Sequence, residues 1–344
     1  MVLDNPMHET RKRDHIEQAR NAQISPNMVD DRFYYEPLMS GHPNQDFDIS
    51  VTFLEKKLNA PLWISSMTGG VGEARHINLH LAKLCKEFGL GMGLGSCRSL
   101  LSSNQYFDDF NLRPIIGYDF PFYANFGIAQ IEKMLEVGDT HKLIELCKKL
   151  EVDGLFIHIN PLQEWLQPEG DRFKRSPLET LEKFCEIKNQ SDLKLIVKEV
   201  GQGMGPKSLK ALFDLPIDAF ELAGFGGTNF SKIESLRKKS NEQTQCDEIL
   251  FHVGHTPKEM ICFLNELGIE NKNIAHIPLI ISGGIENYLD GYYLRSLSKN
   301  PSIYGHANKF LSCAENYDEL QKFTTDQIQG LKLASSYLTL KETL

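Results

Sequence analysis

The stretch VDGLFIHINPLQEWLQPEGDRF (residues 152–173) shows the pattern on which the fold prediction rests. Its first six residues, VDGLFI, are largely apolar and predict a buried β-strand. The chain then becomes abruptly polar at His158 and continues through Asn160, Gln163 and Glu164. A core strand that ends in several polar groups is typical of a sheet whose strand ends carry a site.

The same alternation of a short apolar run and an amphipathic stretch recurs along the chain. Helical patterns lie at 78–89, 176–190 and 256–268, and the second of them begins with Ser176 as N-cap, Pro177 and the capping-box residue Glu179. Eight apolar runs are predicted to be strands: PLWISSM (61–67), LGMGLG (90–95), PFYANF (121–126), DGLFIHI (153–159), LKLIVKEV (193–200), IDAFELA (217–223), IPLIISGG (277–284) and SIYG (302–305).

These elements predict an α/β fold. Near-continuous apolar strands joined through helices require parallel pairing, and eight such units predict a closed (β/α)8 TIM barrel. We expect a single domain over residues 1–344, with an N-terminal extension (1–55) and a long insertion after strand six (225–276). The alternative is an open doubly wound sheet, but the loop MTGGVGEA lacks the G-x-G-x-x-G spacing expected after its first strand.

The composition limits the partners. A net charge of −9, with 41% hydrophobic and 24% charged residues, is that of a soluble globular protein and argues against general nucleic-acid or anionic-membrane binding. The seven cysteines form no CxxC pair, which favours reduced thiols. No secretory leader is recognisable, and no segment approaches the ~20 apolar residues of a membrane span. A cytoplasmic protein is therefore expected.

In a barrel, function is expected at the carboxyl ends of the strands, because the loops there converge on one mouth. Seven of the eight ends contain glycine, beside several hydroxyl and amide side chains. Glycine at one end can reflect turn chemistry alone, but glycine at nearly every end favours a large ligand approached closely by backbone. The ends are SSMTGG (65–70), GSCRS (95–99), ANFG (124–127), HINPLQE (158–164), KEVGQGMG (198–205), AGFGGTN (223–229), SGGIEN (282–287) and YGHAN (304–308).

Two features favour a mononucleotide at this mouth. Gly283 and Gly284, followed by Gly305 to Ala307, occupy the place where barrels commonly bind phosphate through backbone N–H groups. Strand alternation points Lys198 either into the mouth or into the helical layer. It is either half of a structural ion pair or, as we prefer, a cation facing an electron-rich ligand such as the N1/C2 edge of a reduced flavin.

Several of these segments, taken together, resemble type 2 isopentenyl-diphosphate delta-isomerase, the FMN-dependent family. The segments are RKRDHI (11–16), SSMTGG, GSCRS, ANFG, HINPLQE, GDRF (170–173), VKEVGQGMG and GFGGT, whereas HVGHT (252–256) and GGTNF depart from the family pattern. The resemblance implies a TIM barrel that uses reduced FMN and Mg²⁺, with NADPH as reductant. It also implies interconversion of isopentenyl and dimethylallyl diphosphate, and a homo-oligomer, either tetramer or octamer.

The resemblance also implies roles for individual residues. His158 and Gln163 are expected to be catalytic, and Glu164 to bind magnesium. The substrate diphosphate is expected to contact Arg11, Lys12, Ser96, Cys97, Arg98, Asn160 and Gln163. FMN is expected to contact Met67, Thr68, Gly69, Ser96, Asn125, Lys198, Thr228, Gly283, Gly284, His306 and Ala307.

Elementary chemistry fits these roles. Guanidinium groups suit diphosphate oxygens, and Mg²⁺ typically takes only one or two protein carboxylates together with substrate phosphates. The isomerisation adds a proton to an alkene and removes one from the allylic carbon. Gln163 is neutral and cannot act as a strong base, so we interpret it as positioning or relaying a proton near the flavin.

Two other functions are considered. An FMN-dependent 2-hydroxy-acid oxidase on the same barrel needs an arginine for the substrate carboxylate late in the chain, and SGGIENYLDG lacks it. A non-catalytic flavin or phosphate sensor would keep the barrel, but His158, Gln163 and Glu164 argue against it. The two histidines of HVGH (252–255) have no visible carboxylate or cysteine partner, and a metal site is not predicted there.

Overall fold

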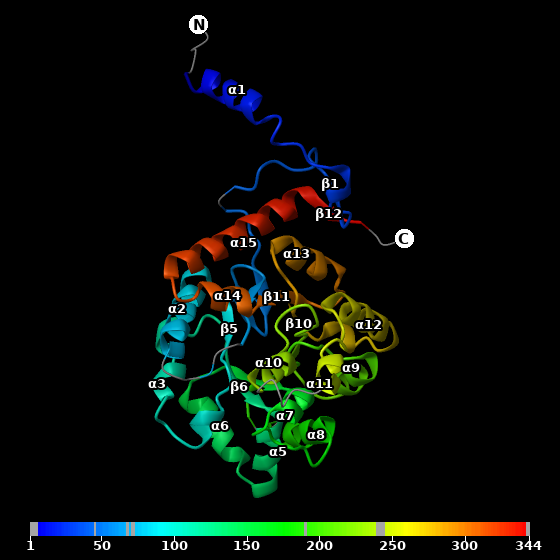
Figure 1. Cartoon of the computed structure of the whole chain (residues 1–344). Coiled ribbons are helices and arrows are strands. Elements are labelled where there is room, and N and C mark those ends of the chain that lie inside the picture. The colour runs from blue at the N-terminus through cyan, green and yellow to red at the C-terminus, as the bar shows by residue number, and fades with distance from the viewer. Residues whose placement is uncertain are drawn as a thin grey trace.

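Eight parallel strands close into a barrel in the order β10-β11-β4-β5-β6-β7-β8-β9. The computed structural model describes residues 6–44, 46–66, 69, 73–188, 191–238 and 245–341 (Figure 1). Every predicted strand is present to within a few residues, and the predicted (β/α)8 TIM barrel is confirmed. The strands are β4 Leu62–Ile64, β5 Gly91–Gly93, β6 Phe122–Gly127, β7 Gly154–His158, β8 Lys194–Lys198, β9 Ala219–Glu221, β10 Leu279–Ser282 and β11 Ser302–His306.

Helices follow the strands and surround the barrel (Figure 1). The helices are α2 Glu73–Phe88, α3 Phe107–Phe110, α4 Arg113–Ile116, α5 Ile128–Val137, α6 Thr140–Lys149, α7 Pro161–Leu166, α8 Pro177–Lys188, α9 Pro206–Phe213, α10 Phe230–Arg237, α11 Gln245–Leu250, α12 Pro257–Glu270, α13 Tyr288–Leu297, α14 Asn308–Cys313 and α15 Tyr317–Tyr337, with 3-10 turns at Pro26–Met28, Arg98–Leu101 and Ile274–His276.

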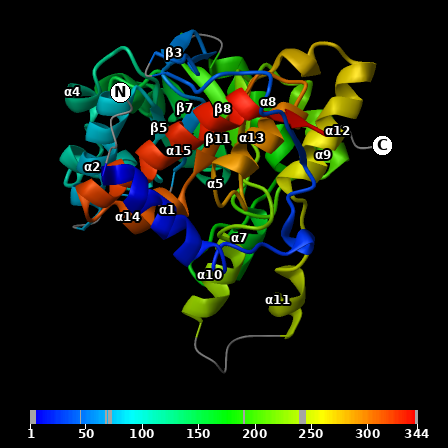
Figure 2. The ribbon, with the colours of Figure 1, turned by 90° about the horizontal axis from the view of Figure 1, so that it is seen from above.

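Three helices match the predicted helical patterns, and the expected insertion is also present. The patterns correspond to α2, α8 and α12, and Ser176 Oγ accepts a hydrogen bond from the backbone N–H of Glu179 (3.2 Å). α10, α11 and α12 form the insertion between β9 and β10, and α10 and α11 project from the barrel (Figure 2). Among the described residues, no helix has the length and apolar character needed to cross a membrane.

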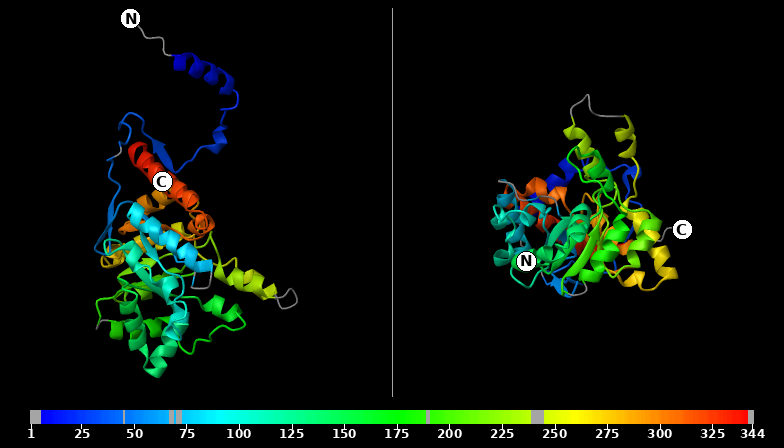
Figure 3. Two further views of the ribbon diagram at one scale, coloured as in Figure 1. Left: turned by 90° about the vertical axis from the view of Figure 1, so that its left-hand side faces the viewer. Right: turned by 90° about the horizontal axis from the view of Figure 1, so that it is seen from below.

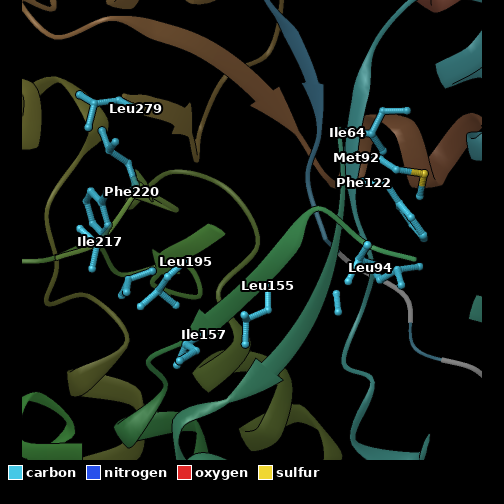
Figure 4. Packing of buried hydrophobic residues seen from close by; sticks show 14 of the residues in the cluster. Ile64, Met92, Leu94, Phe122, Leu155, Ile157, Leu195, Ile217, Phe220 and Leu279 are labelled. Atoms are coloured by element: carbon cyan, nitrogen blue, oxygen red, sulfur yellow. The ribbon is translucent and has the colours of Figure 1, made fainter. Parts of the chain in front are cut away.

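The barrel strands separate two apolar layers, because successive side chains point to opposite faces. The outward side chains pack against the surrounding helices, and Ile64, Met92, Phe122, Leu155 and Leu195 belong to this layer (Figure 4). The inward side chains fill the barrel, and they include Trp63, Tyr123, Phe156, Ile196, Ala219, Ile280 and Ile303. The interior is therefore a packed core below the mouth.

A β-hairpin that the sequence analysis did not predict closes the amino-terminal end of the barrel. β2 Val51–Phe53 pairs antiparallel with β3 Lys56–Leu58. Phe53 is 2% exposed, and its ring centroid lies 5.6 Å from that of Trp63 inside the barrel. The expected end of the extension at residue 55 thus falls within this hairpin.

The N-terminal extension is tied to the end of the chain. β1 Phe33–Tyr35 pairs antiparallel with β12 Leu338–Leu340, which directly follows α15. Before β1, helix α1 Pro6–Gln18 projects away from the barrel (Figures 1 and 3). Residues 10–31 are all exposed.

Candidate functional site

A cavity of about 400 Å³ lies at the carboxyl ends of β4, β8, β9, β10 and β11. This volume is within the usual range for small-molecule sites. Six of the predicted cofactor residues line it: Lys198, Thr228, Gly283, Gly284, His306 and Ala307. The barrel thus brings together residues that are more than a hundred positions apart in the sequence.

Backbone forms one wall of this cavity, where the loops after β9 and β10 touch. Gly283 has φ +100°, and a Cβ added there would lie 2.1 Å from the carbonyl oxygen of Gly224. A side chain at this position would therefore separate the two loops. The glycines predicted to bind phosphate are required by this close approach.

Lys198 points into the barrel. It follows the inward residue Ile196 at the period of two, is 6% exposed and lines the cavity. In register it lies between His158 of β7 and Glu221 of β9. Among the described residues no carboxylate lies within ion-pair distance of its ammonium, so the structural ion pair considered above is not observed there.

Glu221 was missed by the sequence analysis. It is 1% exposed and lines the same cavity. Its Oε1 accepts a hydrogen bond from Ser282 Oγ (3.0 Å), whereas its Oε2 has no partner among the described atoms. Its position in IDAFELA could have revealed it, since Glu221 shares the inward face with Ala219.

His158 and Asn125 form a pair at the ends of β7 and β6. His158 Nδ1 lies 2.9 Å from Asn125 Oδ1, and because a carbonyl oxygen only accepts, Nδ1 donates. Burial, with a smaller effect of Lys198, lowers the pKa of His158 to about 3. The imidazole is therefore neutral near pH 7, and Nε2 carries a free lone pair.

A second network joins α7 to α10. Asn160 Nδ2 donates to Gln163 Oε1 (3.0 Å) and to Glu164 Oε1 (3.1 Å), while Gln163 Nε2 donates to Glu234 Oε1 (3.3 Å). The predicted substrate, catalytic and metal residues of this segment thus lie in one network. Glu234, 4% exposed, was not predicted, because α10 comes from the insertion after β9.

The segment GDRF supports α7. The backbone N–H of Asp171 donates to Glu164 Oε2 (2.7 Å), and Arg172 donates to the carbonyl oxygen of Glu164 while its guanidinium lies 4.7 Å from the Trp165 ring centroid. The Asp171 carboxylate also lies 3.5 Å from Arg98. This segment therefore holds Glu164 and orients the predicted diphosphate-binding Arg98.

Two predicted site residues direct their side chains away from the cavity. Cys97 is 0% exposed in the apolar core, and burial raises the pKa of its thiol to about 12. The His306 ring packs against Phe310 and Phe323, with centroids 6.1 and 5.5 Å away, and burial lowers its pKa to about 4. His306 nevertheless belongs to the cavity lining, whereas Cys97 does not. Ser96 is partly exposed, and Arg98 has a half-exposed side chain.

The remaining predicted residues are distributed differently. Arg11 and Lys12 lie on α1, which projects away from the barrel (Figures 1 and 3), and neither residue lines the cavity. Met67 and Thr68 lie outside the described residues, and Gly69 packs against the backbone of Ser96. Across the described ranges, no cluster of three or more histidine, cysteine or acidic side chains is arranged to hold a metal ion.

Curated relatives cover nearly the whole chain, although no family model matches it. An isopentenyl-diphosphate delta-isomerase from Rickettsia africae (strain ESF-5) is 31% identical over 349 aligned residues, covering 99% of this chain and 98% of the relative. An isopentenyl-diphosphate delta-isomerase from Nostoc sp. (strain PCC 7120) is 34% identical over 327 residues, covering 93% of this chain and 89% of the relative.

Solved structures with the same fold are more distant in sequence. A flavocytochrome b2 variant with sulfite bound aligns with a TM-score of 0.58 at 13% identity, covering 88% of this chain and 71% of that chain. A mandelate oxidase variant with a monooxide FMN adduct has a TM-score of 0.52 at 11% identity, covering 91% of this chain and 88% of that chain. At such low identity these structures bear on the fold alone.

Proposed function

The chain belongs to the isopentenyl-diphosphate delta-isomerase family, and from this premise we propose that it interconverts isopentenyl and dimethylallyl diphosphate on reduced FMN. The observation that carries the proposal is the buried Lys198, which faces the mouth cavity without a described carboxylate partner, beside the His158–Asn125 pair. A site built for an electron-rich, phosphorylated ligand explains why a cation is kept there.

The residues present fit FMN. Among the cavity-lining residues, Ser65 Oγ, Ser66 Oγ and Glu221 Oε2 are buried polar atoms with no partner among the described atoms, so a ligand rich in donors and acceptors would satisfy them. Lys198 would hold the N1/C2 edge of the ring, and the backbone at Gly283, Gly284 and Gly305 to Ala307 would hold the phosphate. When bound and kept reduced by NADPH, FMN supplies an electron-rich face for proton addition and removal.

The side chains of this chain position the substrate around that face. Neutral His158 donates through Nδ1 to Asn125 and leaves Nε2 as an acceptor. Gln163 is held between Asn160 and Glu234, so its amide is oriented without being charged. A strong base would take up the proton and keep it, whereas a neutral amide positions a proton near the alkene without trapping it.

Glu164 and the basic residues would bind the diphosphate. Each carboxylate oxygen of Glu164 accepts one hydrogen bond, which leaves lone pairs for one Mg²⁺ shared with substrate oxygens. Arg98 is oriented by Asp171 at the edge of this region. Arg11 and Lys12 would join only after α1 reaches a mouth, either its own or that of a second copy.

We also propose a cytoplasmic homo-oligomer, either a tetramer or an octamer, formed by a single-domain chain. Apolar side chains are unusually exposed along the N-terminal extension, among them Ile24 (78%), Leu38 (94%) and Met39 (76%). Such surfaces are typical of contacts with another chain. Light scattering of the purified protein checks this; a monomer at all concentrations would contradict it.

The decisive experiment tests flavin and isomerisation together. The purified protein is expected to bind FMN and to convert isopentenyl diphosphate to dimethylallyl diphosphate with FMN, NADPH and Mg²⁺. No isomerisation under reducing conditions would overturn the proposal. Oxidation of lactate or glycolate instead would favour the 2-hydroxy-acid oxidase.

The role of Gln163 is tested with a matched pair of variants. Gln163→Leu should lower turnover by about 100-fold or more with FMN affinity unchanged, because it removes a group that orients a proton. Gln167→Leu is the control, since Gln167 ends the same helix and its amide bonds only Glu169 in the described structure. Equal turnover in the two variants would contradict the role.

A further inference from the structure

Glu221 is a buried carboxylate that takes no part in the proton addition or removal proposed above. It is 1% exposed at the end of β9, and only one of its two oxygens is hydrogen-bonded, to Ser282 Oγ. The other oxygen, Oε2, has no partner among the described atoms. A half-paired buried carboxylate is costly for a folded protein, so its presence calls for a ligand group that completes it.

The neighbours of Glu221 indicate which part of a ligand it meets. On β8, Lys198 is the register partner of Glu221. On β10, the register partner of Glu221 is Ile280, and Ser282 lies two residues further along that strand. Gly283 and Gly284 come directly after Ser282. Glu221 therefore stands between the cation assigned to the flavin ring and the backbone assigned to the phosphate.

In FMN, the ribityl chain connects the ring to the phosphate, and its polar groups are hydroxyls. A hydroxyl can donate a hydrogen bond, and an ionised carboxylate can only accept. Ser282 Oγ donates to Glu221 Oε1 and accepts from the backbone N–H of Ala223 (3.1 Å), which holds the carboxylate in place. The free Oε2 thus suits a ribityl hydroxyl in both chemistry and position.

We propose that Glu221 is a flavin-positioning residue whose Oε2 accepts a hydrogen bond from a ribityl hydroxyl of FMN. The inference rests on the proposed function, because it requires FMN in the cavity. By fixing the chain between ring and phosphate, Glu221 sets how far the ring extends toward Lys198. The carboxylate therefore selects the ribityl part of the cofactor, while Lys198 meets its ring.

The test measures dissociation constants of FMN, and of analogues that each lack one ribityl hydroxyl, by quenching of flavin fluorescence. Glu221→Leu should weaken FMN by about 10- to 100-fold, as expected for a lost hydrogen bond to a charged group. One analogue should bind wild type and Glu221→Leu with equal affinity, because it lacks the hydroxyl whose hydrogen bond Glu221 accepts. Glu221→Gln, which keeps an acceptor oxygen, should lose less.

Glu132→Leu is the matched control. Glu132 is also a buried carboxylate, 5% exposed, but it accepts from the backbone N–H groups of Lys174 and Arg175, outside the cavity. The Glu132→Leu substitution should lower the melting temperature and leave the ratio of the dissociation constants of FMN and the analogues unchanged. Glu221→Leu should instead keep or raise the melting temperature of the flavin-free protein, because it removes a half-paired charge.

The outcomes separate this inference from the proposed function. If wild type binds FMN but Glu221→Leu weakens FMN and every analogue by the same factor, or not at all, the positioning role is overturned and the function stands. If wild type does not bind FMN, both fail. If Glu221→Leu does not fold, the same comparison in Glu221→Gln decides: a loss specific to one hydroxyl supports the role, and a uniform loss overturns it.

Discussion

The two ends of the barrel are built from the same strands but differ in kind. At the amino-terminal end, inward positions hold Trp63, Tyr123, Phe156, Ile196, Ala219 and Ile280. One inward step later, the same strands carry Ser65, Asn125, His158, Lys198, Glu221 and Ser282. A step of two residues thus separates a packed core from a polar mouth.

The two ends also differ in whether their buried polar atoms have hydrogen-bond partners. The apolar end is sealed by the β2–β3 hairpin, with Phe53 packed on Trp63. At the mouth, Ser65, Ser66 and Glu221 retain buried polar atoms without a described partner. One end of the barrel therefore contributes stability, and the other keeps binding capacity at some cost in stability.

Lys198→Met gives the largest expected effect at the mouth. Turnover should fall by about 1,000-fold, because the variant loses the cation that we propose faces the flavin edge, while the melting temperature stays equal or rises. Steady-state isomerisation and thermal unfolding check this. Lys210→Met is the control, since Lys210 is exposed on α9 and pairs only loosely with Glu270 (3.7 Å). If the variant instead lost stability and kept its turnover, Lys198 would contribute to stability, and the mouth would not differ from the apolar end in the way described above.

Phe53→Ala tests the opposite end. It should lower the free energy of unfolding by about 3 kcal/mol, because it leaves a cavity against Trp63. Urea unfolding checks the loss, and flavin titration of the folded protein should give an unchanged dissociation constant. Ile269→Ala, at a residue 72% exposed, serves as the control with little loss. A large change in flavin affinity would show that the two ends are coupled.

The pH dependence of stability should come partly from two buried histidines, His158 at the end of β7 and His306 in the aromatic core. The pKa values of His158 and His306 are lowered to about 3 and about 4 in the folded protein, so unfolding takes up protons below the ordinary value near 6.5. Their contribution is complete above about pH 6.5 and is lost as the pH falls, toward about 4 for His306 and about 3 for His158, at about 1.4 kcal/mol per pH unit for each histidine.

His306→Phe isolates one of these contributions. Phenylalanine suits the surrounding cluster of Phe310 and Phe323, so folding should survive. Urea unfolding between about pH 6.5 and 4.5 should give a slope of stability against pH smaller by about one proton. An unchanged slope would mean that His306 is not buried neutral.

Asp171→Asn gives the smallest expected effect. It loosens Arg98, whose side chain is half exposed, so the KM for isopentenyl diphosphate should rise by about threefold to fivefold with kcat nearly unchanged. Glu179→Gln, which removes a surface pair with Lys183, is the control. A fall in kcat as large as that of Gln163→Leu would assign Asp171 a direct role in the chemistry.

Several features were out of reach of sequence patterns. The β2–β3 hairpin and the β1–β12 pair are short and not strongly alternating, so no period indicated them. The side chains of Cys97 and His306 face the core. His306 follows Gly305 in β11, so strand alternation could have shown its outward direction, whereas Cys97 lies beyond the end of β5, where no alternation shows it. Glu234 came from the insertion and joins Gln163 across 71 residues.

The barrel and its polar mouth follow from local order in the chain: period-two alternation makes a strand's inward face predictable, and eight repeats favour closure. That reasoning places His158, Lys198 and the glycine loops at one mouth. The pairs His158 with Asn125 and Glu221 with Ser282 depended on barrel closure, since they join residues 33 and 61 positions apart. Contacts of that separation are determined by strand stagger and packing, which no local pattern encodes.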